Sequence, residues 1–122
     1  TPPCWCIYML GLVLEWLEGQ GGIPGMEAIK HAKAQMLYEV IDSSRLFTCA
    51  VEKSSRSDMN VVFRTGNDEL DAKFVQEATA AGFTNLKGHR SVGGMRASIY
   101  NAMPTEGVEK LCDFIKAFDR NN

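Results

Sequence analysis

Acidic residues are missing from one long stretch of this chain, between Glu77 and Glu106, although Asp and Glu outnumber Lys and Arg overall. The 122 residues carry 13 Lys and Arg against 15 Asp and Glu, which gives a net charge of -2. A chain without an overall positive charge does not favour nucleic acids or anionic membranes as partners. Three cations, Lys87, Arg90 and Arg96, lie inside the acid-free stretch. This stretch is therefore a candidate anion-binding site.

The chain also lacks a hydrophobic run long enough to span a membrane. Its most apolar stretch is CWCIYMLGLVL at residues 4–14, followed by Glu15 and Glu18. That run is well short of the ~20 residues that a membrane span requires. We predict a buried helix from about Trp5 to Glu18. Because the sequence starts at Thr1 without a Met and becomes apolar at once, we expect it to be a piece of a longer protein.

Cysteine and histidine are scarce and poorly spaced for metal binding. The four cysteines are Cys4, Cys6, Cys49 and Cys112. They form no C-x-x-C pair with a nearby histidine, so we predict no metal site. Without a secretory signal, reduced and buried thiols in a cytoplasmic protein are expected. His31, between lysines on a helix face, is expected at the surface.

The chain is long enough, and at 45% hydrophobic residues apolar enough, for a single domain over residues 1–122. After the first helix, glycines at 19–25 predict a break, and Asp42 ends a second helix. We predict strands at 45–52, 59–65, 83–87 and 95–100, a helix that Asn67 caps and that ends at Gly82 in the left-handed conformation, and a last helix from Pro104. This order indicates an α+β or α/β domain, with a small mixed or antiparallel sheet and helices packed on it.

Helical spacing predicts which faces of three helices are buried. For the second helix the predicted buried residues are Ile29, Ala32, Met36, Leu37, Val40 and Ile41, with Lys30, Lys33 and Glu39 in solvent. For the third they are Leu70, Phe74, Ala78 and Ala81. For the last they are Val108, Leu111, Cys112, Ile115 and Phe118.

The acid-free stretch contains a glycine pair, Gly93 and Gly94, followed by an alternating strand pattern that points Arg96 away from the core. Glycine can adopt positive φ and lets a ligand approach the backbone closely. The guanidinium groups of Arg90 and Arg96 suit carboxylates and phosphates, because each offers two parallel hydrogen bonds. His89 adds a further donor. The alternative is a tight turn whose basic residues are solvated or paired with surface carboxylates.

Four segments carry a family resemblance across the whole chain: TPP at 1–3, GLVLEWL at 11–17, SRSDMNVVF at 55–63 and KGHRSVGGMRASIYNAMP at 87–104. They resemble the C-terminal part of phosphoserine aminotransferases, which are class V enzymes that use pyridoxal 5'-phosphate. The resemblance implies the small C-terminal domain of a fold-type I pyridoxal-phosphate transferase. Residues 1–20 would then form a helix that packs on the cofactor domain.

The resemblance also implies roles for individual residues. Arg96 matches the arginine that binds the α-carboxylate of the substrate. His89 and Arg90 match the pair that reaches the substrate phosphate from the neighbouring subunit of a homodimer. Thr1 matches a threonine that contacts the cofactor phosphate, also across the dimer interface. The family's Schiff-base lysine lies upstream of this chain, so no catalytic residue is assigned here and the isolated chain is expected to be inactive.

The implied activity of the intact enzyme is transfer of an amino group from glutamate to 3-phosphohydroxypyruvate, in serine biosynthesis. The partners would be these small molecules and a second subunit, with no nucleic acid and no membrane. The sequence leaves one alternative open. The same loop could belong to a non-catalytic regulatory module that binds an amino acid or a phosphate ester.

Overall fold

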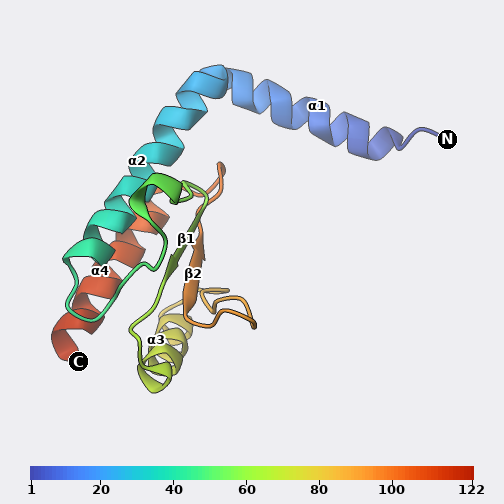
Figure 1. The fold of residues 1–122 in the computed structure, drawn as a ribbon. Helices are drawn as coiled ribbons and strands as arrows, with labels where there is room; N and C mark the ends of the chain where they lie inside the picture. The colour runs from blue at the N-terminus through green and yellow to red at the C-terminus, as the bar shows by residue number, and fades with distance from the viewer.

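The computed structural model describes all residues from Thr1 to Asn122. The elements in chain order are α1 (Cys4–Gly19), α2 (Gly22–Ser43), the short 3-10 helix η1 (Lys53–Ser55), β1 (Asn60–Phe63), α3 (Asp68–Ala80), β2 (Met95–Ser98) and α4 (Thr105–Asn121). The two strands form an antiparallel sheet, and α2 and α4 lie side by side next to it (Figure 1). The predicted small mixed or antiparallel sheet with helices packed on it is confirmed, and the sheet is antiparallel.

The sheet separates a core face from an outer face. Val61 lies opposite Ala97, and Phe63 lies opposite Met95, with all four side chains buried. The alternating residues of both strands are only half-buried, as the period-two pattern predicts. Arg96 is one of these, so it lies on the outer face as expected.

Two of the predicted strands are wrong. Residues 45–52 contribute one isolated bridge, from Thr48 to Arg64, and residues 83–87 contribute another, from Lys87 to Met95. In the first segment the amides of residues 45–47 bond to side chains instead of a neighbouring strand. Ser44 Oγ accepts from the amides of residues 46 and 47, and the Asp119 carboxylate accepts from those of residues 45 and 46. In the second segment Asn85 has a φ of 60°, which interrupts an extended chain.

Helices α3 and α4 bear out most of the local predictions. All five residues predicted to face inward from α4 are buried. Asn67 caps α3, because its Oδ1 accepts from the amides of Glu69 at 2.9 Å and Leu70 at 3.2 Å. Gly82 follows α3 with a φ of 92°, the left-handed conformation common after a helix. The predicted buried stripe of α3 is partly wrong: Leu70 is half-buried and Ala81 is exposed, whereas Asp71 is buried.

The buried face of α2 differs from the prediction at three positions. Ile29 and Ala32 are exposed, and Lys33, expected in solvent, is completely buried. Lys33 Nζ donates to the carbonyl oxygens of Tyr100 and Met103, both at 2.9 Å. Burial lowers the pKa of Lys33 below its ordinary value. The lysine thereby ties α2 to the turn between β2 and α4.

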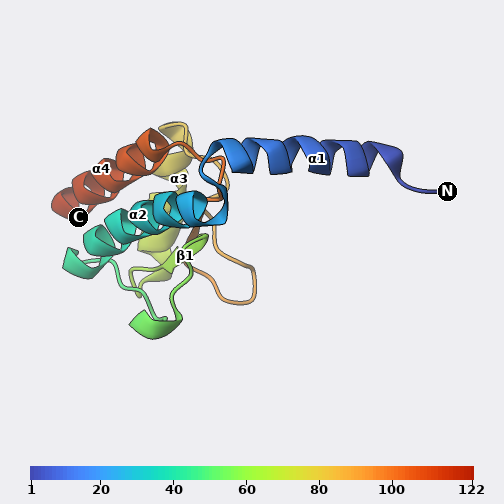
Figure 2. The ribbon, with the colours of Figure 1, turned by 90° about the horizontal axis from the view of Figure 1, so that it is seen from above.

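Helix α1 projects from the N-terminal end of α2, away from the rest of the molecule, in both ribbon views (Figures 1 and 2). The predicted burial of this helix is wrong for the chain alone, because none of its residues is buried and Trp5 is 72% exposed. Cys4 and Cys6 are therefore exposed thiols, not buried ones. No other element covers the apolar surface of α1. None of the helices combines the length and apolarity needed to cross a bilayer.

Candidate functional site

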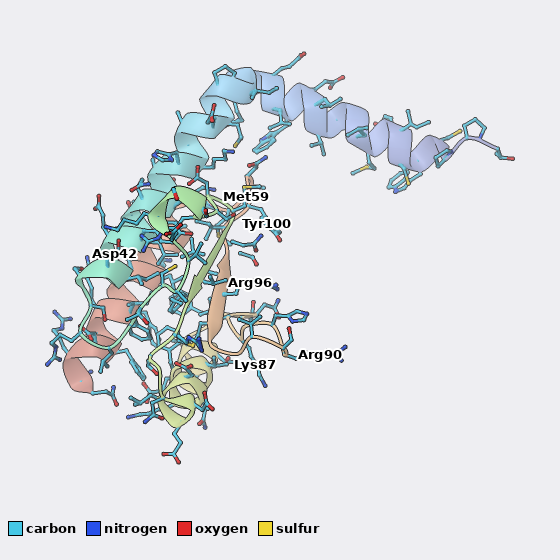
Figure 3. All side chains as sticks on the ribbon, in the orientation of Figure 1. Asp42, Met59, Lys87, Arg90, Arg96 and Tyr100 are labelled. Carbon is cyan, nitrogen blue, oxygen red and sulfur yellow. The ribbon has the colours of Figure 1, made fainter.

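The acid-free stretch folds into a closed loop. The amide of Gly88 donates to the carbonyl oxygen of Gly94 at 2.8 Å, and the carbonyl of His89 accepts from the amides of Val92 and Gly93, both at 2.9 Å. We call residues 88–94 the anion loop. In Figure 3 its Arg90 side chain lies at the outer end of the loop, away from the sheet, and Arg96 follows on the strand.

Glycines make this loop geometry possible. Gly93 and Gly94 have φ values of 75° and 63°, as predicted. A Cβ at Gly94 would lie 2.8 Å from the carbonyl oxygen of Phe63, and one at Gly88 would lie 2.1 Å from that of Gly93. The loop backbone therefore packs closely on itself and on β1. This packing fixes the positions of the Cα atoms from which the loop side chains extend.

Arg96 is the best-defined anion-binding candidate. Strand β2 holds it on the outer face, directly opposite Val62 of β1. Its Nε is buried and has no hydrogen-bond partner within the chain. A buried donor without a partner costs about 1–3 kcal/mol, so a group that accepts from Arg96 is expected from outside this chain. A carboxylate would satisfy the guanidinium with two parallel hydrogen bonds.

A pocket of about 210 Å³ surrounds Arg96 and is lined by Thr48, Ala50, Val62, Phe63, Arg64, Gly88, His89, Val92, Gly93 and Met95 as well. No carboxylate is among these residues. Arg64 is a lining cation that sequence reasoning missed, because the search covered only the acid-free stretch. The sequence signal was its position two residues after Val62. Because side chains alternate along an extended chain, Arg64 lies on the same face as Val62, which is the residue opposite Arg96.

Arg90 lines a second hollow at the anion loop, with Lys87 and residues of α3 that include Asp68 and Asp71. His89 lines both hollows. Within one chain the structure therefore brings His89 to Arg96 but does not bring Arg90 into the same pocket. None of the three cations of the acid-free stretch forms a salt bridge with the nearby carboxylates.

The residues present fit an anionic substrate better than a complete cofactor site. Thr1, the residue that the resemblance connects to the cofactor phosphate, is exposed before α1, and the N-terminus lies far from the anion loop (Figure 1). The pocket around Arg96 contains no lysine. The one buried lysine, Lys33, is already bonded to two carbonyl oxygens. No group of three or more metal-binding side chains gathers anywhere in the chain.

Comparison with known families decides the family of the chain. The family model described as aminotransferase class-V matches residues 1–111. The chain belongs to this family. Phosphoserine aminotransferases are among its similar relatives: that of Lactiplantibacillus plantarum is 55% identical over 122 residues, covering 100% of the chain and 34% of the relative. That of Listeria monocytogenes serotype 4b is 57% identical over 118 residues, covering 97% and 32%.

Solved structures of phosphoserine aminotransferases share the fold. A phosphoserine aminotransferase from Bacillus circulans subsp. alkalophilus matches with a TM-score of 0.96 and 47% identity, over 99% of this chain and 34% of that one. The pyridoxal-phosphate-bound enzyme from Trichomonas vaginalis matches with a TM-score of 0.89 and 40% identity, over 95% and 34%. The chain thus spans about a third of the length of the relatives it matches, and it aligns with their C-terminal part.

Proposed function

We propose that this chain is the substrate-binding, C-terminal part of a phosphoserine aminotransferase. The intact enzyme would transfer an amino group from glutamate to 3-phosphohydroxypyruvate, giving 2-oxoglutarate and phosphoserine for serine biosynthesis. The observation that carries the proposal is Arg96, whose buried Nε has no partner and which lines a pocket without carboxylates. The matches to phosphoserine aminotransferases over 97–100% of the chain support it.

In this proposal Arg96 binds the α-carboxylate that every amino-acid substrate carries. A guanidinium edge, with Nε and one terminal nitrogen, can donate two parallel hydrogen bonds to the two carboxylate oxygens. The strand pairing of β2 with β1 keeps the arginine backbone rigid. Nearby Gly93 has no Cβ, so the substrate can approach the loop backbone closely.

His89 and Arg90 would bind the phosphate at the other end of the substrate, from the neighbouring subunit of a homodimer. Arg90 does not line the Arg96 pocket of its own chain. As the resemblance implies, a substrate held by Arg96 would meet the Arg90 of a second copy. The absence of a salt bridge at Arg90 supports this role, since the guanidinium is free for a phosphate.

The cofactor would be pyridoxal 5'-phosphate, which a relative from Trichomonas vaginalis is described as binding. When bound, this cofactor supplies an electron sink for the bonds that change at the substrate carbon. From this chain, as the resemblance implies, Thr1 would contact the cofactor phosphate across the dimer interface. The chain alone is expected to be inactive, because such chemistry requires a positioned lysine and Lys33 is held by two carbonyls.

A cytoplasmic location stays part of the proposal, and the free state of all four cysteines supports it. No observation favours the alternative of a regulatory module, and the aminotransferase match along residues 1–111 weighs against it.

A chimeric enzyme tests the proposed function. The chain would replace the matching 34% of the Lactiplantibacillus plantarum enzyme, with which it is 55% identical. We expect the chimera to form phosphoserine from glutamate and 3-phosphohydroxypyruvate, and the unaltered enzyme is the control. A chimera that folds and binds the cofactor but forms no phosphoserine would contradict the proposal.

A further inference from the structure

The two histidines of the chain have different hydrogen-bond partners at the same ring nitrogen. His31 Nδ1 lies 3.2 Å from Asp58 Oδ2. His89 Nδ1 lies 2.7 Å from Ser91 Oγ and 3.3 Å from the Ser91 amide nitrogen. The partners therefore differ in whether they accept or donate a hydrogen bond.

These partners determine where the ring proton lies. A carboxylate only accepts, so His31 must carry a proton on Nδ1. A backbone amide only donates, so its contact at 3.3 Å favours a free lone pair on His89 Nδ1, and the Ser91 hydroxyl, at 2.7 Å, is the stronger donor to the same lone pair. The neutral ring of His89 then carries its proton on Nε2, on the far side of the ring from Ser91.

We propose that Ser91 is a positioning residue that holds His89 with Nε2–H free to donate to the substrate's anionic group. This inference rests on the proposed function, in which His89 meets the substrate phosphate. A ring fixed in this way offers a donor without needing a positive charge. Its orientation is also set before binding, which saves the entropy of ordering an exposed side chain.

The anion loop keeps Ser91 in place for this task. The His89 carbonyl accepts from the amides of Val92 and Gly93, both at 2.9 Å, so the turn is closed directly after Ser91. The same turn directs the Ser91 amide toward His89 Nδ1. Backbone and hydroxyl of one residue thus act together on one ring nitrogen.

Nuclear magnetic resonance on the 15N-labelled chain tests the proton positions without any enzyme activity. Long-range proton–nitrogen spectra distinguish protonated from unprotonated ring nitrogens, and His31→Gln and His89→Gln variants assign the two rings. We expect opposite tautomers, with the proton on Nε2 in His89 and on Nδ1 in His31. In Ser91→Ala the His89 signals should move toward a mixture of tautomers, and Ser91→Thr should restore the original pattern.

Kinetics of the chimeric enzyme test the functional part. Ser91→Ala should raise KM for phosphoserine about two- to tenfold, the effect of one lost hydrogen bond, with kcat little changed. Ser91→Thr should keep most of the binding. Ser54→Ala is the matched control, because Ser54 is exposed in η1, far along the chain from the anion loop.

Failures of the inference and of the proposed function are distinguishable. A wild-type chimera that folds and binds the cofactor but is inactive would reject the proposed function. An active chimera in which Ser91→Ala leaves the phosphoserine KM unchanged would reject the role of Ser91. A His89 ring with its proton on Nδ1 would also reject it, while leaving the proposals for Arg96 and Arg90 intact.

Discussion

Gly88 and Gly94 close the anion loop with one backbone hydrogen bond, from the Gly88 amide to the Gly94 carbonyl oxygen at 2.8 Å. The two backbones are so close that a Cβ at Gly88 would lie 2.1 Å from the carbonyl oxygen of Gly93. The opposing atoms belong to the backbone, so no side-chain rotation can relieve the contact. The positions of His89 and Arg90 in the loop therefore depend on residue 88 being a glycine, which has no Cβ.

We expect Gly88→Ala to displace the anion loop and to weaken substrate binding in the chimeric enzyme. Shifting a binding group by about 1 Å can cost up to about a hundredfold in catalytic efficiency. We therefore expect kcat/KM for phosphoserine to fall by about ten- to a hundredfold. Gly19→Ala is the control, since a Cβ there meets nothing within 4 Å. Equal kinetics for the two variants would contradict this account of the loop.

Arg96→Lys is expected to weaken glutamate and phosphoserine alike. Both substrates carry an α-carboxylate, and an ammonium cannot reproduce the planar pair of hydrogen bonds that a guanidinium makes. Single-turnover kinetics of the chimeric enzyme, with each amino acid in turn, would measure the two half-reactions. A loss confined to one substrate would show that Arg96 does not bind the shared carboxylate.

Arg90→Ala is expected to separate the two substrates. In the proposed function Arg90 contacts a phosphate that glutamate lacks, so the phosphoserine half-reaction should lose about 1.5–3 kcal/mol, the value of a charged hydrogen bond. The glutamate half-reaction should be largely spared. Equal losses for both amino acids would refute the assignment of Arg90 to the phosphate.

Sequence reasoning succeeded where structure depends on neighbouring residues. The cap at Asn67 and the buried face of α4 follow from local spacing, and both are confirmed. The alternation that puts Arg96 on the outer face is equally local. The candidate site could therefore be located from its own segment of about 20 residues.

Sequence reasoning failed where residues distant in the chain determine whether a side chain is buried or a strand forms. Lys33 is buried because the carbonyls of Tyr100 and Met103, 67 and 70 residues away in sequence, accept from its Nζ. Residues 45–52 have a strand-like composition, but the Asp119 carboxylate accepts hydrogen bonds from backbone amides that would otherwise bond to a neighbouring strand. Helix α1 is apolar yet exposed, because nothing else in this chain packs over it. The spacing of apolar residues predicts which face of a helix or strand is apolar, but not which groups pack against that face.

The exposed apolar surface of α1 leads to a prediction about the isolated chain. We propose, as the resemblance implies, that α1 packs on the cofactor domain of the intact enzyme. Without that domain, Trp5, Leu12 and Leu14 are exposed and should cause self-association. Light scattering should show oligomers whose population falls in a Leu12→Glu, Leu14→Glu variant. A strictly monomeric wild-type chain that binds no hydrophobic dye would count against this proposal.

The buried thiol of Cys112 leads to a prediction of how the stability of the chain changes at alkaline pH. Burial raises the pKa of its thiol from the ordinary value of 9.0 to about 11. Between these two values the unfolded chain loses the proton while the folded chain keeps it. The thiol therefore favours unfolding progressively as the pH rises from 9.0 to about 11.

The expected effect is a loss of about 2 kcal/mol of unfolding free energy at about pH 10.5, relative to about pH 8. Burial also raises the pKa of Tyr38 and lowers the pKa of Lys33, so these two groups contribute to the pH dependence of stability as well. Urea unfolding of the wild type and of Cys112→Ala at both pH values removes their contribution, because both groups are present in each protein. Replacing the buried Cys112 with alanine should lower the free energy of unfolding at the lower pH and lower it much less at the higher pH. If the difference between the two proteins is the same at both pH values, the Cys112 thiol does not control this part of the alkaline stability.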